Sequence, residues 1–189
     1  MASRLPGPHD TLLFFSLVFW LCGGMLYIWM ISLIFYRYTF FRFAPSDLMP
    51  PYWVNMGAMA ISALAGTTLI ANVPRSALLG QMRPFLLGFT ALFWATATWW
   101  IPMLVILAVW RHVYRRFEMT YDPLYWGAVF PLGMYSVSTL RLAHVLELPF
   151  LLFLPRVFLF VALVAWSATF VGLLRHLSRS GRTSAHAAA

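Results

Sequence analysis

Charged residues are scarce in this sequence: they make up 10% of its 189 residues, and only five residues are acidic. Soluble domains carry roughly 25% charged residues, so the composition excludes an ordinary soluble domain. Hydrophobic residues make up 62% of the chain and its mean hydropathy is +0.79, which indicates an integral membrane protein embedded in the lipid bilayer. The net charge of +8 does not predict nucleic-acid binding, because the arginines lie in short loops between apolar segments, where they act as topology signals.

The sequence also lacks the groups that several function classes need. Its single cysteine, Cys22, allows no intramolecular disulfide and no cysteine-based metal site. No Asp, Glu or Lys lies within the apolar segments, whereas proton-coupled pumps usually need ionisable groups at depth. His112 and His176 lie near the opposite membrane edge from His144, so no facing histidine pair for haem is predicted. A catalytic triad, paired catalytic carboxylates and a phosphate-binding glycine loop are all missing. We therefore expect neither an enzyme nor a cofactor.

Five apolar stretches reach the length of about 20 residues that spans a bilayer. They lie at about 11–36, 52–72, 84–110, 123–145 and 156–175. The sequence thus predicts an all-α membrane domain over 11–176, with a short N-terminal segment (1–10) and a disordered cytoplasmic tail (177–189). Asp122 and Pro123 are a typical helix start, and prolines also open the second, third and fifth stretches: Pro50, Pro51, Pro84 and Pro155.

The arginines are unevenly divided between the two sides of the predicted bundle. The side of the C-terminus holds eight of them and the other side five. By the positive-inside rule the C-terminus is therefore cytoplasmic, and we expect a location in the cell (inner) membrane.

Aromatic pairs recur at a fixed spacing along the chain. Tyr52-Trp53 opens the second stretch and Tyr125-Trp126 the fourth, 73 residues later, while Trp94 and Trp166 are 72 residues apart. Aromatic residues at any membrane interface explain each feature singly, but not the shared spacing. The spacing predicts repeated helical hairpins.

The second stretch carries a face of small and weakly polar residues. Asn55, Ala58, Ser62 and Gly66 fall on one side of a helix. Two interpretations stay open for this face: close helix packing through small residues, or a pore wall with room for a hydrated solute.

Pro131 interrupts the fourth stretch between Gly127 and Gly133. Proline leaves the carbonyl of Gly127 without its helical partner, which predicts a kink, and lipid tolerates such a carbonyl only beside protein or water. Phe130 lies about 10 Å along this helix, at a rise of about 1.5 Å per residue. It could close a narrow path there, or pack against a neighbouring helix.

Three stretches resemble one known family. They are PPYWVNMGAMAISALAG (50–66), FWATATWWIPM (93–103) and YWGAVFPLGMYSVSTLRLA (125–143). These stretches are similar to the tellurite-resistance/C4-dicarboxylate transporter family. That family includes the yeast malate permease and sulfite pump and the slow anion channels of plant guard cells. The resemblance implies a ten-helix subunit with quasi-fivefold symmetry, commonly assembled as a trimer, whose inner helices line a pore that a phenylalanine occludes.

On this resemblance Phe130 is the pore gate, and Gly127, Pro131 and Gly133 shape the kink beside it. Candidate pore-lining residues are Asn55, Ala58, Ser62, Gly66, Met134 and Thr139, and Arg141 is a candidate anion vestibule residue. The five predicted helices correspond to the second half of the family's fold. We therefore expect transport of small anions or C4-dicarboxylates by a truncated or split-gene half, completed by further copies or by a partner chain. The alternative is a non-transporting membrane subunit that only packs against a partner.

Overall fold

The computed structural model describes residues 8–42, 44, 47–48, 50–117 and 121–187, and the secondary structure in this part of the chain is helical. Five long helices form a bundle: α1 (Pro8–Phe40), α2 (Val54–Ala71), α4 (Arg83–Val109), α5 (Trp126–Val145) and α6 (Phe153–Ala187). Shorter elements join them: η2 (Pro50–Trp53), η3 (Val73–Arg75), α3 (Ala77–Gln81), the π-turn η4 (Trp110–Tyr114), η5 (Pro123–Tyr125) and η6 (Pro149–Leu152). The all-α class is thus confirmed.

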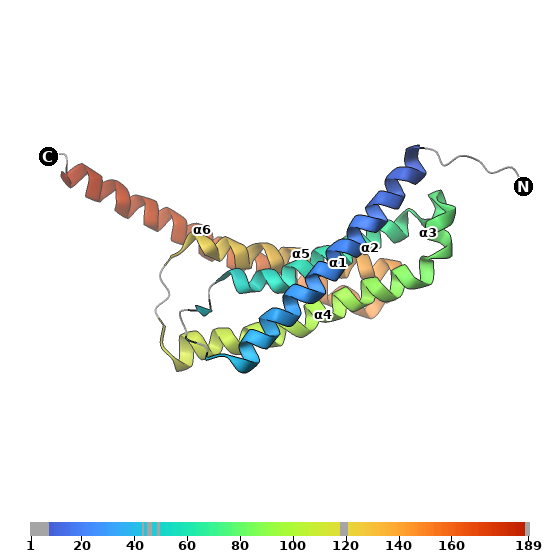
Figure 1. Cartoon of the computed structure of the whole chain (residues 1–189). Helices are drawn as coiled ribbons and strands as arrows, with labels where there is room; N and C mark the ends of the chain where they lie inside the picture. Colours follow the sequence, from blue (N-terminus) through green and yellow to red (C-terminus); the bar gives the residue numbers. More distant parts are fainter. Residues whose placement is uncertain (1–7, 43, 45–46, 49, 118–120, 188–189) are drawn as a thin grey trace, which may run out of the picture.

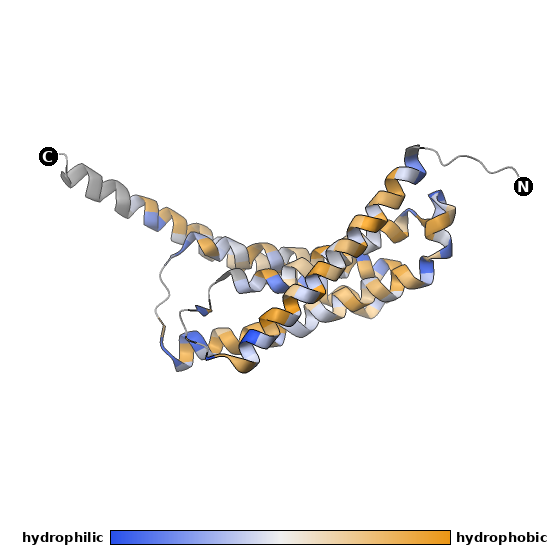
Figure 2. Ribbon diagram, viewed as in Figure 1, coloured by the Kyte–Doolittle hydropathy of each residue, from blue (hydrophilic) through white to orange (hydrophobic). Residues whose placement is uncertain are grey.

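Helices α2, α4 and α5 lie roughly side by side, α1 crosses them obliquely, and the start of α1 and the end of α6 lie at opposite ends of the bundle (Figure 1). Helix α2 packs against α1, α4 and α5, and α5 packs in turn against α6. The core lies where α2, α4 and α5 meet, around Met56, Phe93, Trp100 and Tyr135. Apolar residues cover the middle of the long helices, and polar residues gather toward the ends (Figure 2). A belt of apolar side chains between two polar ends matches the hydrocarbon core of a bilayer and its two headgroup layers.

Four helices in the described part of the chain are long and apolar enough to cross a membrane: His9–Phe40, Val54–Ala71, Arg83–Tyr114 and Pro149–Ser178. The fourth predicted span corresponds to α5, a helix of 20 residues that is less apolar because it carries Ser136, Ser138, Thr139 and Arg141. Both serines and Thr139 are buried between α5 and its neighbours. The protein, rather than lipid, therefore surrounds these three hydroxyl side chains, whereas Arg141 is exposed near the end of the helix.

The two repeated hairpins have matching starts. In each, a short 3₁₀ turn that begins with proline leads into a long helix: η2 precedes α2, and η5 precedes α5. As predicted, Asp122 caps the second of these starts, because its carboxylate accepts a hydrogen bond from the Leu124 amide at 2.8 Å. The 3₁₀ turns place Tyr52 and Tyr125, which mark the repeat in the sequence, at the same end of the bundle.

Two predicted boundaries on α6 differ from the structure. The helix begins at Phe153 rather than Pro155, since η6 already starts the turn at Pro149. It then continues to Ala187, through most of the segment (177–189) for which we predicted disorder. After Pro155 no proline stops it, and Ala and Arg, which make up six of the 13 residues in this segment, favour helix.

Hydrogen bonds tie the helices together within the apolar bundle. Trp20 of α1 donates through Nε1 to the Ser62 carbonyl of α2 at 2.8 Å. Trp94 of α4 donates to the Thr139 hydroxyl of α5 at 2.9 Å. Ser136 of α5 donates to the Pro155 carbonyl of α6 at 2.7 Å. Each bond satisfies a polar group that would otherwise face hydrocarbon.

Candidate functional site

Helix α5 has one packed face and one open face. Pro131, Tyr135, Thr139 and Leu142 are buried against neighbouring helices. The opposite face carries a stripe of residues with helical spacing that this chain leaves largely open: Phe130, Gly133, Met134, Val137, Arg141 and His144. We call this set the α5 stripe.

Phe130 lies on the open face. Phe130 is 57% exposed. The structure therefore does not bury this ring in the chain's own core, as the packing interpretation requires. An added Cβ at Gly133 meets no atom within 4 Å, so the stripe stays open one turn further along. Gly127 is half-buried.

Pro131 fixes the place where α2 and α5 come closest. A Cβ added to Gly57 of α2 would lie 2.8 Å from both Cβ and Cγ of the Pro131 ring, so only glycine fits there. Helix α5 continues without a break through Pro131, from Trp126 to Val145. The predicted kink stays a prediction, but the proline has a clear packing role. The sequence pattern did not identify Gly57 as a contact residue, because Gly57 lies outside the helix face that carries Asn55, Ala58, Ser62 and Gly66.

The small residues of α2 lie in helix contacts. Ala58 and Ser62 are both buried; the Ser62 hydroxyl bonds to the Ala58 carbonyl within α2 at 3.0 Å, and the Ser62 carbonyl accepts the bond from Trp20 of α1. Gly66 lies against Thr90 and Trp20, and the Thr90 hydroxyl leaves no room for a Cβ there. Within this chain, these three residues thus have the packing role that was one of the two interpretations, and their pore-lining role stays a prediction.

The other candidate pore-lining residues are placed differently. Thr139 is fully buried, accepts from Trp94 and donates to the Tyr135 carbonyl at 2.7 Å. Met134 is half-buried at the edge of the core and belongs to the α5 stripe. Asn55 is also half-buried, and its side-chain nitrogen is buried without a hydrogen-bond partner.

A groove joins the open faces of α2 and α5 at the arginine-poor end of the bundle. It has a volume of about 410 Å³ and is lined by Leu64, Thr68 and Ala71 of α2 and by Val137, Arg141 and His144 of α5. Arg141, the predicted vestibule residue, is thus exposed beside this groove. The groove extends the α5 stripe toward the membrane surface. Its charged and titratable lining residues are Arg141 and His144, so any charge that it carries is positive.

Arg111 was counted in the sequence only as a topology signal, although the structure buries it at the opposite end of the bundle. No sequence signal separates it from the neighbouring exposed arginines Arg115 and Arg116. The π-turn η4 places it at the end of α4.

No group of three or more metal-ligating side chains lies close together in the described part of the chain.

The bundle of long apolar helices defines an all-α integral membrane protein. Residues 1–174 match the voltage-dependent anion channel family, and the chain belongs to this family. The family also covers the tellurite-resistance and C4-dicarboxylate transporters, so the resemblance in the sequence is confirmed. At the level of the family, the activity is transport of anions across a membrane rather than an enzymatic reaction.

Curated relatives differ in how much of their length the chain matches. An uncharacterized membrane protein of Mycobacterium tuberculosis is 39% identical over 165 residues, which cover 84% of this chain and 82% of the relative. An uncharacterized transporter of Methanocaldococcus jannaschii is 26% identical over 131 residues, which cover 69% of this chain but only 36% of that transporter. No solved structure matches the chain significantly.

Proposed function

We propose that this protein forms part of a passive pathway for small anions or C4-dicarboxylates, along the open faces of α2 and α5, with Phe130 as the gate. The observation that carries the proposal is the exposure of Phe130 on a stripe that leads to the groove beside Arg141. A large ring in that position, one residue before the closest contact of α2 and α5, stands where it can narrow a path along both helices.

The chemistry of the open faces favours anions and passive passage. The stripe carries no acidic residue, and Arg141 with His144 supplies a cationic rim at one end. A path with an uncharged middle does not hold an anion too tightly to release it. The membership of the chain in an anion channel family supports the same class of solute.

Further copies of the chain would complete this pathway. Two open helix faces cannot enclose a pore by themselves, and the archaeal transporter matches this chain over only 36% of its own length. We propose homo-oligomers, such as the trimers implied by the resemblance, in which the α2 and α5 faces of neighbouring copies meet. A partner chain that supplies the remaining helices is the other possible arrangement.

Flux through liposomes tests the gate. Purified protein is reconstituted at several protein-to-lipid ratios, and the efflux of chloride, nitrate and malate is measured for the wild type, Phe130→Ala and Phe160→Ala. Phe160 is the matched control, because it is 68% exposed on the outer helix α6. We expect Phe130→Ala to raise the efflux and Phe160→Ala to leave it unchanged, with efflux rising more steeply than linearly with protein density if copies associate. A folded Phe130→Ala variant with wild-type efflux would contradict the gate.

A non-transporting membrane subunit is the second candidate. It is favoured by the burial of Ala58, Ser62 and Gly66, which leaves the small-residue face of α2 committed to packing. In that case liposomes with the wild type and with both phenylalanine variants all stay tight to the three anions. Crosslinking in cells would then recover one dominant partner chain.

A further inference from the structure

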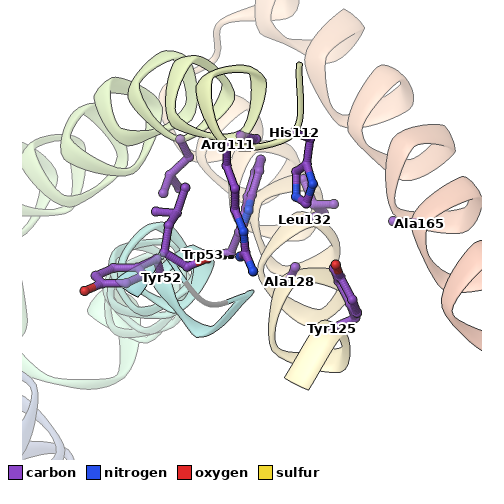
Figure 3. Close-up of a pocket in the computed structure, with 11 residues that line it drawn as sticks. Tyr52, Trp53, Arg111, His112, Tyr125, Ala128, Leu132 and Ala165 are labelled. Atoms are coloured by element: carbon purple, nitrogen blue, oxygen red, sulfur yellow. Dashed lines mark hydrogen bonds between the residues drawn. The ribbon is translucent and has the colours of Figure 1, made fainter. Parts of the chain in front are cut away.

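A separate cavity of about 230 Å³ lies at the arginine-rich end of the bundle. Figure 3 shows Arg111 and His112 reaching from the end of α4 toward Trp53 and Tyr125, with Ala165 of α6 across the space. The contribution of α5 comes from Ala128 and Leu132, which lie on the face of the helix opposite to Phe130. The cavity is therefore distinct from the proposed anion pathway and does not depend on it.

Arg111 brings into this cavity a positive charge that no described residue neutralises. Its side chain is only 9% exposed. One guanidinium nitrogen, Nη1, donates to the Leu48 carbonyl, and the group lies 4.3 Å from the centroid of the Phe117 ring. Its Nε is buried and has no hydrogen-bond partner, and no carboxylate pairs with Arg111 in the part of the chain that the structure describes. Because an unpaired buried charge is costly, this arrangement indicates that an anion completes the site.

Arg111 lies at the level of the headgroup layer of the membrane, while Ala128, Leu132 and Ala165 line the cavity deeper in the bundle. Arg111 comes 28 residues after Arg83, the first residue of α4. At about 1.5 Å per residue this is a length of about 42 Å, which exceeds the hydrocarbon thickness of about 30 Å. Exposed Arg115 and Arg116 follow directly, so the surface around the cavity is also positive. Single π-turns in helices are found frequently at functional sites, and the π-turn η4 carries Arg111.

The lining selects a monoanion that is attached to an apolar group. The guanidinium offers a planar fork that fits two phosphate or carboxylate oxygens. The walls beyond it are mainly apolar, with Leu104, Leu132 and Trp53. A free phosphate dianion would have to shed its water against these walls. The phosphodiester of a lipid carries one charge, already lies at this depth, and continues into acyl chains.

We propose that this cavity binds the phosphodiester headgroup of an anionic phospholipid through Arg111. The lipid enters from the membrane at the level of η4. It supplies a counter-charge that no residue in the described part of the chain provides, and thereby stabilises the end of α4 against α5 and α6.

Thermal unfolding of the purified chain in detergent tests the proposal. The wild type, Arg111→Gln and Ala128→Leu are titrated with dioleoylphosphatidylglycerol, with dioleoylphosphatidylcholine and, separately, with inorganic phosphate. Ala128→Leu fills the cavity while keeping the arginine. Arg175→Gln is the matched control, because Arg175 is an exposed arginine near the same end of the bundle.

We expect phosphatidylglycerol to raise the unfolding temperature of the wild type and Arg175→Gln, with a rise that follows the logarithm of its concentration above the dissociation constant, and phosphatidylcholine to do so much less. Arg111→Gln should weaken the apparent affinity for phosphatidylglycerol by about tenfold or more, the loss expected when a charge-assisted hydrogen bond is removed. Ala128→Leu should lose the response in the same way, so it provides the test if Arg111→Gln does not fold.

Three results would overturn the proposal. The first is a wild-type lipid response in Ala128→Leu, or in folded Arg111→Gln. The second is an equal effect of phosphatidylcholine and phosphatidylglycerol on the wild type. The third is an Arg111-dependent stabilisation by inorganic phosphate alone, which would assign the cavity to a soluble anion in place of a lipid.

Discussion

The contact between Gly57 and Pro131 allows a quantitative test of how the two central helices fit together. In Gly57→Ala the new Cβ would lie 2.8 Å from two ring atoms of Pro131 and 3.1 Å from its Cα. Neither the ring nor the backbone of a proline can rotate away, so the helices must move apart. Overpacking of this kind costs about 1–3 kcal/mol.

Gly133→Ala is the matched control for this substitution. It also replaces a glycine inside a membrane helix, but its Cβ meets no atom within 4 Å. Both variants gain about 1 kcal/mol of helix propensity, which therefore cancels in the comparison. The difference in the free energy of unfolding between the two variants should then be about 1–3 kcal/mol, or roughly 5- to 150-fold in the unfolding equilibrium.

The assay is reversible unfolding of each variant in mixed micelles, followed by circular dichroism. We expect Gly133→Ala to be at least as stable as the wild type and Gly57→Ala to be less stable. Because Pro131 is bonded to Phe130, the displaced helix should also change anion efflux under conditions where Gly57→Ala is folded. Equal stability of the two variants would refute the close contact of α2 and α5 at this point.

Three further predictions concern other contacts. Thr139→Val removes the acceptor of Trp94 and should cost about 0.6 kcal/mol of unfolding free energy, and at most about 1.7 kcal/mol. The control Thr96→Val loses only a bond within its own helix and should cost less, so equal costs in the micelle assay would contradict a bond between helices. Asp122→Ala removes the cap of η5 and should cost about 0.5–2 kcal/mol, while Asp122→Asn should retain most of the stability, so equal losses would argue against capping. Arg141→Gln should reduce anion efflux more at 0.01 M than at 0.15 M ionic strength, because the screening length falls from about 30 Å to about 8 Å; a loss independent of salt would contradict an electrostatic role.

Much of the fold could be predicted from the sequence because a bilayer imposes simple rules. Apolar length marks where the helices lie, and proline with a capping residue marks where they start. The repeat of Tyr52-Trp53 and Tyr125-Trp126 predicts the two hairpins, and in the structure both pairs lie at matching 3₁₀ starts. The end of α6 was predicted less well, since a polar composition does not by itself prevent a helix from continuing.

The sequence by itself determined the class and the family, because these depend on composition and local motifs. The number of five spans stays a prediction, since four helices in the described part of the chain are long and apolar enough to cross a membrane. Only the tertiary structure decided which side of each helix is packed. It assigned Ser62 and Gly66 to helix contacts, left Phe130 exposed and buried Arg111 away from water. The physical reason is that a helical periodicity identifies a face but not its neighbour, and the same small residues serve close packing and a pore wall equally well. The neighbour is set by contacts between residues far apart in the chain, such as Gly57 with Pro131 and Trp94 with Thr139.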